Sequence, residues 1–487
     1  LIFRENLSES FSSEAMQQTN AIIVNSKIDY TNRKDLTNLS IITIDGADAK
    51  DLDDAVYVEK LENGNYRLIV SIADVAHYVK KDSTLDLEAR ERGNSVYLVD
   101  RVLPMFPKEI SNGICSLNEK EEKLTFSCDM EIDSKGDVVN YEVYKSVIKS
   151  IHRMTYSDVN LILEDEPKLK NKYTDIYDML KEMLELSKIL RTKKHTRGSI
   201  DFELPEIKVV LNDEKKVEKV ILRERGEAEK IIEDFMIAAN ETVAERIYWL
   251  ELASVYRTHE KPNRDKIYRL NEILAKFGYK IPNLDNVHPK QFQEIIERSK
   301  DKETSMLVHK TILTSLKQAK YTVEDIGHFG LSSSHYTHFT SPIRRYADLM
   351  IHRVLFSSID HKIKQIKRAD LEEISHHISK TERVAMRAED ESVRIKLVEY
   401  MQNRVGEKFE AMVTGFSQRK VFFENSEHIE CSWDVTTAAH YYEFDEEHYC
   451  MRDIDDENVV FNLGDKIEVL LKYVDLYNLE IAVVPQI

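Results

Sequence analysis

The sequence predicts an α+β fold in which a mixed α/β domain precedes a smaller all-β domain. Short strand-like apolar runs dominate from Ile41 to about residue 150, and helical periodicity dominates from there to residue 402. Strand-like alternation then returns over residues 403–487. A chain of 487 residues is long enough for several domains with a substantial core. We therefore expect a main domain over residues 41–402, a small all-β domain over residues 403–487 and a lead-in segment over residues 1–40.

The strand-rich part carries two hairpin signals. "ENGN" at residues 62–65 lies between two runs of β-branched and aromatic residues, and its Asn-Gly pair favours a tight turn. "SKGD" at residues 134–137 separates "KLTFSCDMEID" from "VVNYEVYKSVIKS" in the same way. Both turns predict antiparallel strand pairs.

The helix-rich part repeats its apolar residues at steps of three and four. This spacing predicts helices over residues 173–194, 227–252, 262–278, 346–359 and 370–404. The segment 262–278 starts with Pro and Asn and ends with Gly, which are typical helix boundaries.

The last eighty or so residues return to alternation. Phe409, Ala411 and Val413 fall on one face of a strand, and several short strand-like pieces follow. By size and pattern alone this is a barrel or a sandwich.

Composition excludes some classes of protein. The net charge of −18 argues against non-specific duplex DNA binding, although residues 145–153, 188–197 and 343–353 are locally basic. We expect solvated helix faces for the first two of these runs. No run of eighteen apolar residues predicts a membrane span, and the four cysteines form no C-x-x-C pair, which favours reduced thiols in a cytoplasmic protein. The start "LIFRENLSESFSSE" has no secretory pattern and no initiator Met, so we expect a fragment of a longer chain.

The stretch "TIDGADAKDLDDAVYV" at residues 43–58 is the most informative in the chain. It holds five aspartates within ten residues, namely Asp45, Asp48, Asp51, Asp53 and Asp54. Two carboxylates about 5 Å apart repel by roughly 3 kcal/mol at an effective dielectric near 20. A solvated acidic loop would tolerate this repulsion, and so would a site in which divalent cations neutralise it. The EF-hand pattern does not fit, because no Gly follows at the required position, whereas magnesium prefers oxygen ligands of this kind.

The spacing of these aspartates favours a shared site. Asp51 and Asp53 face one way in an extended segment, while Asp54 faces the other way. Bringing Asp45 and Asp54 to the same cations needs a bent loop, and Gly46 can supply the bend.

Longer motifs extend this observation. The segments "DGADAKDLDDAV", "RGNSVYLVDRVLPMFPKEISNGICSLN", "GHFGLSSSHYTHFTSPIRRYADLMIHR" and "VGEKFEAMVTGF…FNLGDKIEVLL" occur in the order of the RNB (ribonuclease II) family of exoribonucleases, which the chain resembles. The resemblance implies a processive 3′→5′ exoribonuclease that degrades single-stranded RNA, and structured RNA with a 3′ overhang, to nucleoside 5′-monophosphates. It also implies one or two Mg²⁺ ions, with Mn²⁺ as the alternative metal. The domains that it implies are an RNB catalytic domain over residues 41–402, an RNA-binding OB-fold barrel over residues 403–487, and cold-shock domains ahead of residues 1–40.

The resemblance assigns roles to the acidic and basic residues of the motifs. Asp45 and Asp54 resemble metal ligands with Asp51 in support, and Asp53 resembles a ligand that is also the residue most critical to catalysis. Arg344 resembles the arginine that contacts the scissile phosphate. Asp48 has no catalytic role in the family.

Further residues resemble RNA contacts of the family. Tyr97 and Phe202 match an aromatic pair that stacks on the last bases, which suits an enzyme without sequence preference. The other matches are Glu233, Glu389, Arg345 and, in the C-terminal domain, Phe422. For Arg345 a salt bridge is the competing role. His335 and His338 are expected to be structural or RNA-contacting, because the metal site is already made of oxygen atoms.

Alternative functions remain open at this point. A ribonuclease II-like enzyme would stall at a duplex, and a catalytically inactive RNA-binding protein would share the fold. We expect a monomer in the cytoplasm that acts on RNA with a free 3′ end, with the RNA-decay machinery as a further partner.

Overall fold

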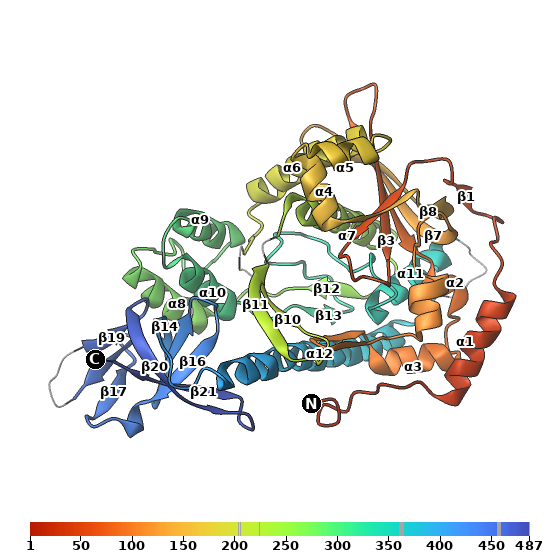
Figure 1. The fold of residues 1–487 in the computed structure, drawn as a ribbon. Coiled ribbons are helices and arrows are strands. Elements are labelled where there is room, and N and C mark those ends of the chain that lie inside the picture. Colours follow the sequence, from red (N-terminus) through yellow and green to blue (C-terminus); the bar gives the residue numbers. More distant parts are fainter. Residues whose placement is uncertain (203, 205, 224, 360–364, 455–458, 487) are drawn as a thin grey trace.

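The computed structural model describes residues 1–487 except 203, 205, 224, 360–364, 455–458 and 487. An α/β body and a C-terminal β-barrel lie at opposite ends of the molecule, and the long helix α12 (Arg368–Gln402) runs between them (Figure 1). The predicted fold class, a mixed α/β domain followed by a barrel, is therefore confirmed.

A seven-stranded sheet forms the centre of the body. Its order is β1-β8-β7-β4-β3-β2-β9, antiparallel except for the two outer pairs, β1–β8 and β2–β9. The strands are β1 (Lys34–Asp35), β2 (Ile42–Asp45), β3 (Asp54–Lys60), β4 (Tyr66–Ala73), β7 (Glu122–Ile132), β8 (Val138–Lys149) and β9 (His152–Thr155). Both predicted hairpins are present, with Gly64 and Gly136 in the left-handed region at φ +86° and +84°. These turns need glycine because other residues rarely adopt that backbone conformation.

Helices cover this sheet and complete the main core. They are α2 (Val75–Tyr78), α3 (Thr84–Arg92), α4 (Tyr156–Leu163), α5 (Pro167–Lys172), α6 (Tyr177–Arg197), α7 (Glu227–Trp249) and α11 (Tyr346–Ile359). Helix α7 buries Ile231, Phe235 and Ala239 against the sheet, as its periodicity predicts. From α11, the rings of His352 and Phe356 pack on Phe126 of β7.

The first forty residues are more than a lead-in. Helix α1 (Ser13–Asn25) buries Ala15 and Thr19, and β1 forms one edge of the main sheet. Next to β1, the guanidinium of Arg33 donates to the fully buried carboxylate of Asp74 at 2.6 Å. A buried ion pair is stable only when its two charged groups are held in direct contact. This contact therefore fixes the segment to the body.

Smaller elements extend from the body. Helices α8 (Arg264–Lys276), α9 (Pro289–Ser299) and α10 (Ser305–Ser315) share an apolar cluster of their own. The remaining pieces are a π-helix (Glu109–Ile114) and three two-stranded sheets, β5 (Val96–Leu98) with β6 (Arg101–Leu103), β10 (Glu206–Leu211) with β11 (Val217–Arg223), and β12 (Tyr256–Thr258) with β13 (Lys320–Thr322).

Five strands close the C-terminal barrel in the order β14-β15-β16-β21-β20. They are β14 (Lys408–Phe416), β15 (Lys420–Asn425), β16 (Glu430–Asp434), β20 (Lys466–Asp475) and β21 (Glu480–Pro485). A 3₁₀ turn (Val435–Thr437) and a three-stranded sheet, β17 (Tyr442–Asp445), β18 (Cys450–Asp453) and β19 (Val459–Asn462), lie between β16 and β20. Leu397, Val398 and Met401 of α12 belong to the barrel's apolar core, so the helix is anchored in the barrel.

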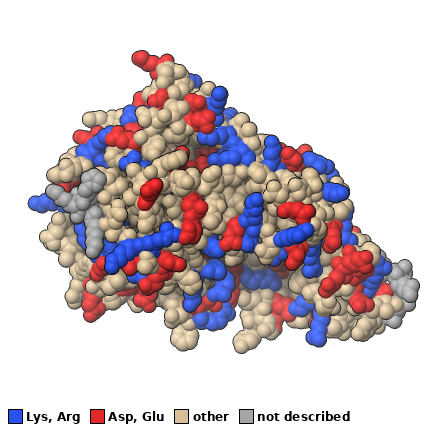
Figure 2. All heavy atoms as spheres, turned by 180° about the vertical axis from the view of Figure 1, so that it is seen from behind, with Lys and Arg blue, Asp and Glu red and all other residues tan. Residues whose placement is uncertain are grey.

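Charges are dispersed over one face of the molecule. On the face seen in Figure 2, acidic and basic side chains alternate over short distances. The basic run 188–197 lies on α6, where Lys193, Lys194 and Arg197 pair with Asp137, Asp234 and Glu241. This run is therefore an ion-paired helix face. None of the described helices combines the length and apolar character that a membrane span requires.

Candidate active site

The acidic stretch forms the connection between two neighbouring strands. Asp45 ends β2 and Asp54 begins β3, and the two strands are hydrogen-bonded in the sheet. The sheet therefore brings these two carboxylates together at the end where β2 stops and β3 starts. Asp51 and Asp53 lie on the loop between the strands, and Asp48, which has no expected catalytic role, is exposed to solvent.

Asp53 is the most constrained of these residues. Its side chain is 5% exposed, and its Oδ1 accepts a hydrogen bond from the backbone N–H of Ile343 at 2.8 Å. Its Oδ2 lies 3.6 Å from Nε of Arg344 and has no hydrogen-bond partner among the described residues. Burial raises the pKa of Asp53 well above its ordinary value, despite the opposing effects of Arg344 and of the N–H group.

The neighbouring carboxylates are also destabilised as anions. Burial, with the charge of Asp45 as a second cause, raises the pKa of Asp54 to about 7. Burial likewise raises the pKa of Asp45, although the N–H of Gly46 donates to its Oδ1 at 2.6 Å. Burial thus outweighs the nearby positive charge of Arg344 at all three carboxylates.

These residues fit a divalent cation. The donors are all oxygen atoms, one buried oxygen of Asp53 is unused, and the raised pKa values would be lowered by a bound cation. Among the described residues, no three His, Cys, Asp or Glu side chains already converge closely enough to hold a metal by themselves.

Asp54→Asn is expected to stabilise the metal-free protein. At pH 8 in a chelator, we expect the free energy of unfolding to rise by about 1–3 kcal/mol, because the variant removes an anion whose folded pKa lies far above its unfolded value. The raised pKa destabilises the folded state increasingly as the pH rises from about 4 to 7. The gain should therefore shrink toward pH 4. Thermal unfolding across this pH range tests it, and a variant less stable than wild type at pH 8 would contradict it.

Tyr97 joins the acidic loop to helix α12. Its hydroxyl donates to Oδ2 of Asp51 at 3.0 Å, and its backbone N–H donates to Oε1 of Glu389 at 2.8 Å. Burial, together with the charge of Asp51, raises the pKa of Tyr97, so the phenol remains a donor. The residue is 39% exposed, which leaves ring surface for stacking. Burial raises the pKa of Glu389, whose observed contact is with the Tyr97 backbone.

Arg344 and Arg345 have different surroundings. The side chain of Arg344 is 44% exposed, and its Nη2 donates to Oγ of Ser341 at 3.1 Å. Arg345 donates from Nε and Nη2 to the two oxygens of buried Asp348, each at 2.8 Å. Arg345 forms the bidentate pair expected of a salt-bridge residue, and its contact with RNA remains a prediction. Arg344 keeps donors available for a phosphate.

Phe202 and Glu233 form a second group. Arg225 donates to Oε2 of Glu233 at 3.0 Å and to the carbonyl of Phe202 at 3.1 Å. The ring of Phe202 is partly buried against the apolar cluster of α8, α9 and α10. Burial raises the pKa of Glu233, although Lys194 and Arg225 oppose the shift. Their contacts to RNA remain predictions.

Phe422, the residue of the barrel that is predicted to contact RNA, is exposed. Phe422 of β15 is 38% exposed, whereas Phe416 of β14 is buried and stacks on Phe444. Lys420 is paired with Glu480 at 2.6 Å, and the carboxylate offsets the attraction of the ammonium group for other anions. The ring of Phe422 is thus accessible, and its contact with RNA remains a prediction.

The two histidines are held in structural contacts. His335 pairs with Asp325 and packs on the ring of Tyr248 at 4.1 Å between centroids. Nδ1 of His338 shares a hydrogen bond of 2.8 Å with the hydroxyl of Tyr321, and burial lowers the pKa of His338 well below its ordinary value.

Tyr156 lies beside the site and was not predicted. Thr155 pairs with Asp45 across β9 and β2, so the next residue, Tyr156, lies beside the loop. Burial raises its pKa, and the charges of Asp45 and Asp54 add to the rise. Only the parallel pairing of β2 with β9, about 110 residues apart in sequence, reveals this neighbour.

Comparison with known proteins connects this geometry to a family. The model of the RNB domain matches residues 33–361. Ribonuclease R of Thermotoga maritima is 45% identical over 92% of this chain and 64% of its own length, and ribonuclease R 1 of Lactococcus lactis is 44% identical over 83% and 50%. Ribonuclease R of Aquifex aeolicus is 37% identical over 98% and 68%. The chain thus spans between one half and about two thirds of these relatives.

Solved structures agree with these matches. Mycoplasma genitalium RNase R in complex with ribose methylated single-stranded RNA superposes with a TM-score of 0.93 at 28% identity, over 99% of this chain and 77% of that chain. The same enzyme in complex with double-stranded RNA gives 0.86 at 27% identity, over 99% and 82%. Yeast Ssd1, a pseudonuclease, gives 0.71 at 20% identity over 86% and 52%, a likeness of fold alone. The motif resemblance is confirmed, and the chain belongs to the RNB domain family.

Proposed function

We propose that this protein is a 3′→5′ exoribonuclease that hydrolyses single-stranded RNA, and structured RNA with a 3′ overhang, to nucleoside 5′-monophosphates. The observation that carries the proposal is the pairing of Asp53 with Arg344. A buried carboxylate with one unused oxygen lies beside an exposed guanidinium, as hydrolysis of a phosphodiester requires. The relatives named ribonuclease R support it.

Each residue of the site has a part in this reaction. Arg344 binds the non-bridging oxygens of the last phosphodiester and offsets the charge that develops on them. Tyr97 stacks on a base near the 3′ end, while Asp51 and Glu389 hold its hydroxyl and its backbone. Asp45, Asp51, Asp53 and Asp54 would hold Mg²⁺, or Mn²⁺ as the alternative. When bound, one or two such ions supply an activated water and stabilise the leaving 3′ oxygen.

Digestion of a duplex with a labelled single-stranded 3′ overhang tests the proposal. With Mg²⁺ we expect labelled 5′-mononucleotides and passage through the duplex, and in a chelator we expect binding without cleavage. Arrest at the duplex boundary would favour a ribonuclease II-like enzyme. Binding without any cleavage in Mg²⁺ and in Mn²⁺ would favour a catalytically inactive RNA-binding protein. If the active protein elutes as a monomer in size-exclusion chromatography, this would support the expected monomeric state.

Tyr97→Ala and Tyr97→Phe separate the two contacts of this side chain. We expect Tyr97→Ala to weaken binding of short single-stranded RNA about tenfold, because loss of one base stack removes about 1–3 kcal/mol. Tyr97→Phe keeps the ring and removes only the hydrogen bond to Asp51, so its RNA affinity should stay within about twofold of wild type. Fluorescence anisotropy in a chelator measures both. Equal losses in the two variants would contradict stacking.

A further inference from the structure

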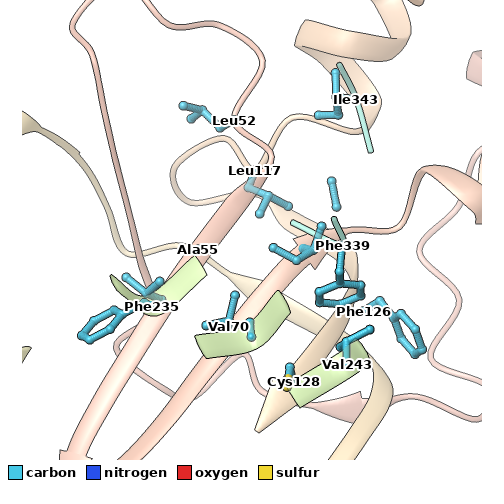
Figure 3. Packing of buried hydrophobic residues seen from close by; sticks show 14 of the residues in the cluster. Leu52, Ala55, Val70, Leu117, Phe126, Cys128, Phe235, Val243, Phe339 and Ile343 are labelled. Carbon is cyan, nitrogen blue, oxygen red and sulfur yellow. The ribbon is translucent and has the colours of Figure 1, made fainter. Parts of the chain in front are cut away.

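The acidic loop rests on a buried segment of the chain that carries no charge. Leu117 donates its N–H to the carbonyl of Leu52 at 3.0 Å. Leu52 and Leu117 are 2% and 0% exposed, and Figure 3 shows them together at one end of the main core. The loop is therefore fixed to the core between Asp51 and Asp53.

The hydroxyl of Ser116 makes a more specific contact. Its Oγ accepts a hydrogen bond from the N–H of Leu52 at 3.1 Å and donates to the carbonyl of Lys50 at 2.9 Å. A second acceptor, Oδ1 of Asn118, lies 3.2 Å from the same hydroxyl. Ser116 is fully buried, so it contacts neither solvent nor RNA.

These two bonds bracket one residue. The carbonyl of Lys50 belongs to the peptide group before Asp51, and the N–H of Leu52 belongs to the peptide group after it. Because one atom holds both peptide planes, the two backbone torsions of Asp51 are restricted together. Those torsions decide where the Asp51 carboxylate points, which here is toward the hydroxyl of Tyr97 at 3.0 Å.

We propose that Ser116 is a positioning residue, which directs the carboxylate of Asp51 toward Tyr97 and the cation site by bridging the peptide groups on both sides of Asp51. The inference rests on the proposed function, since it concerns the same site. A hydroxyl that merely filled space or satisfied the loop backbone would contribute to stability without affecting metal binding. Residues that orient metal ligands typically change metal affinity or activity 10- to 100-fold when they are removed.

The test uses Ser116→Ala with a matched control. Ser127→Ala also removes a fully buried hydroxyl from the main domain, one that bonds to Ser71 and Ser146 in the sheet. Ser116→Cys fills nearly the same space as serine and bonds only weakly, so it repeats the test with packing preserved. Calorimetric titration with Mn²⁺ in the absence of RNA gives metal affinity independently of activity. Thermal unfolding in a chelator gives the stability of each variant.

We expect Ser116→Ala and Ser116→Cys to weaken Mn²⁺ binding about tenfold or more and to lower kcat by a similar factor, while RNA affinity in a chelator stays within about twofold. Ser127→Ala should lose stability but keep wild-type Mn²⁺ affinity. In an Asp51→Asn background, Ser116→Ala should have no further effect on Mn²⁺ binding, because the residue that it positions is already neutral.

Two outcomes overturn the inference. One is wild-type Mn²⁺ affinity in both Ser116 variants, and the other is an undiminished effect of Ser116→Ala in the Asp51→Asn background. Failure of the proposed function looks different, because the wild-type protein itself would then release no nucleotides from RNA.

Discussion

Asp53→Asn is expected to lower turnover by about 10³-fold or more while leaving RNA binding near that of wild type. Asparagine has the same shape and its Oδ1 can still accept from the N–H of Ile343, so the fold should survive. It lacks the negative charge that faces Arg344 and that a cation would need. RNA affinity should persist because Asp53 is 4% exposed and offers almost no surface to a strand.

The measurement combines single-turnover digestion in Mg²⁺ with fluorescence anisotropy in a chelator. Asp48→Asn is the matched control, since Asp48 lies on the same loop, carries the same charge and is exposed. It should retain wild-type turnover. Appreciable turnover by Asp53→Asn would remove the central assignment of this site, and equal losses in both variants would mean that only the net charge of the loop matters.

Arg344→Ala is expected to lower kcat by about 10²–10³-fold, the usual loss when one group that stabilises developing charge is removed. Arg344→Lys should recover only part of this loss, because an ammonium cannot bind two phosphate oxygens as a planar fork does. Both values come from initial rates at saturating RNA and Mg²⁺. If Arg344→Lys lost as much rate as Arg344→Ala, the contribution of Arg344 to catalysis would depend on the planar shape of the guanidinium and not on its positive charge.

Arg387→Lys serves as the control for this pair. Its side chain is 69% exposed, and its ion pair with Glu5 is long at 3.6 Å. We expect unchanged turnover. Arg344→Ala with wild-type kcat would contradict the assignment of Arg344 to the phosphate.

Local patterns in the sequence predict much of this fold. The hairpins at residues 62–65 and 134–137 follow from turn chemistry, and the helix over residues 346–359 has the predicted bounds. These elements depend on residues close together in the chain. By contrast, β1 and β9 pair with strands distant in sequence, so no local pattern reveals them.

The site divides in the same way. The acidic motif identifies Asp53 and its neighbours, because the charge density is visible in sequence. The sequence does not show which charged groups pair with each other, so it gave no indication that Lys420 pairs with Glu480. Neither did the contact between Ser116 and the loop, since a buried hydroxyl bonded to a distant backbone resembles any other serine.

Helix α12 gives the molecule a mechanical property. Glu389, which holds the backbone of Tyr97, and Val398, which lies in the core of the barrel, are on one unbroken helix. Nine residues of helix span about 14 Å, a length over which a helix is stiff. We therefore expect a small tilt of the barrel to be transmitted along α12 and to displace Tyr97.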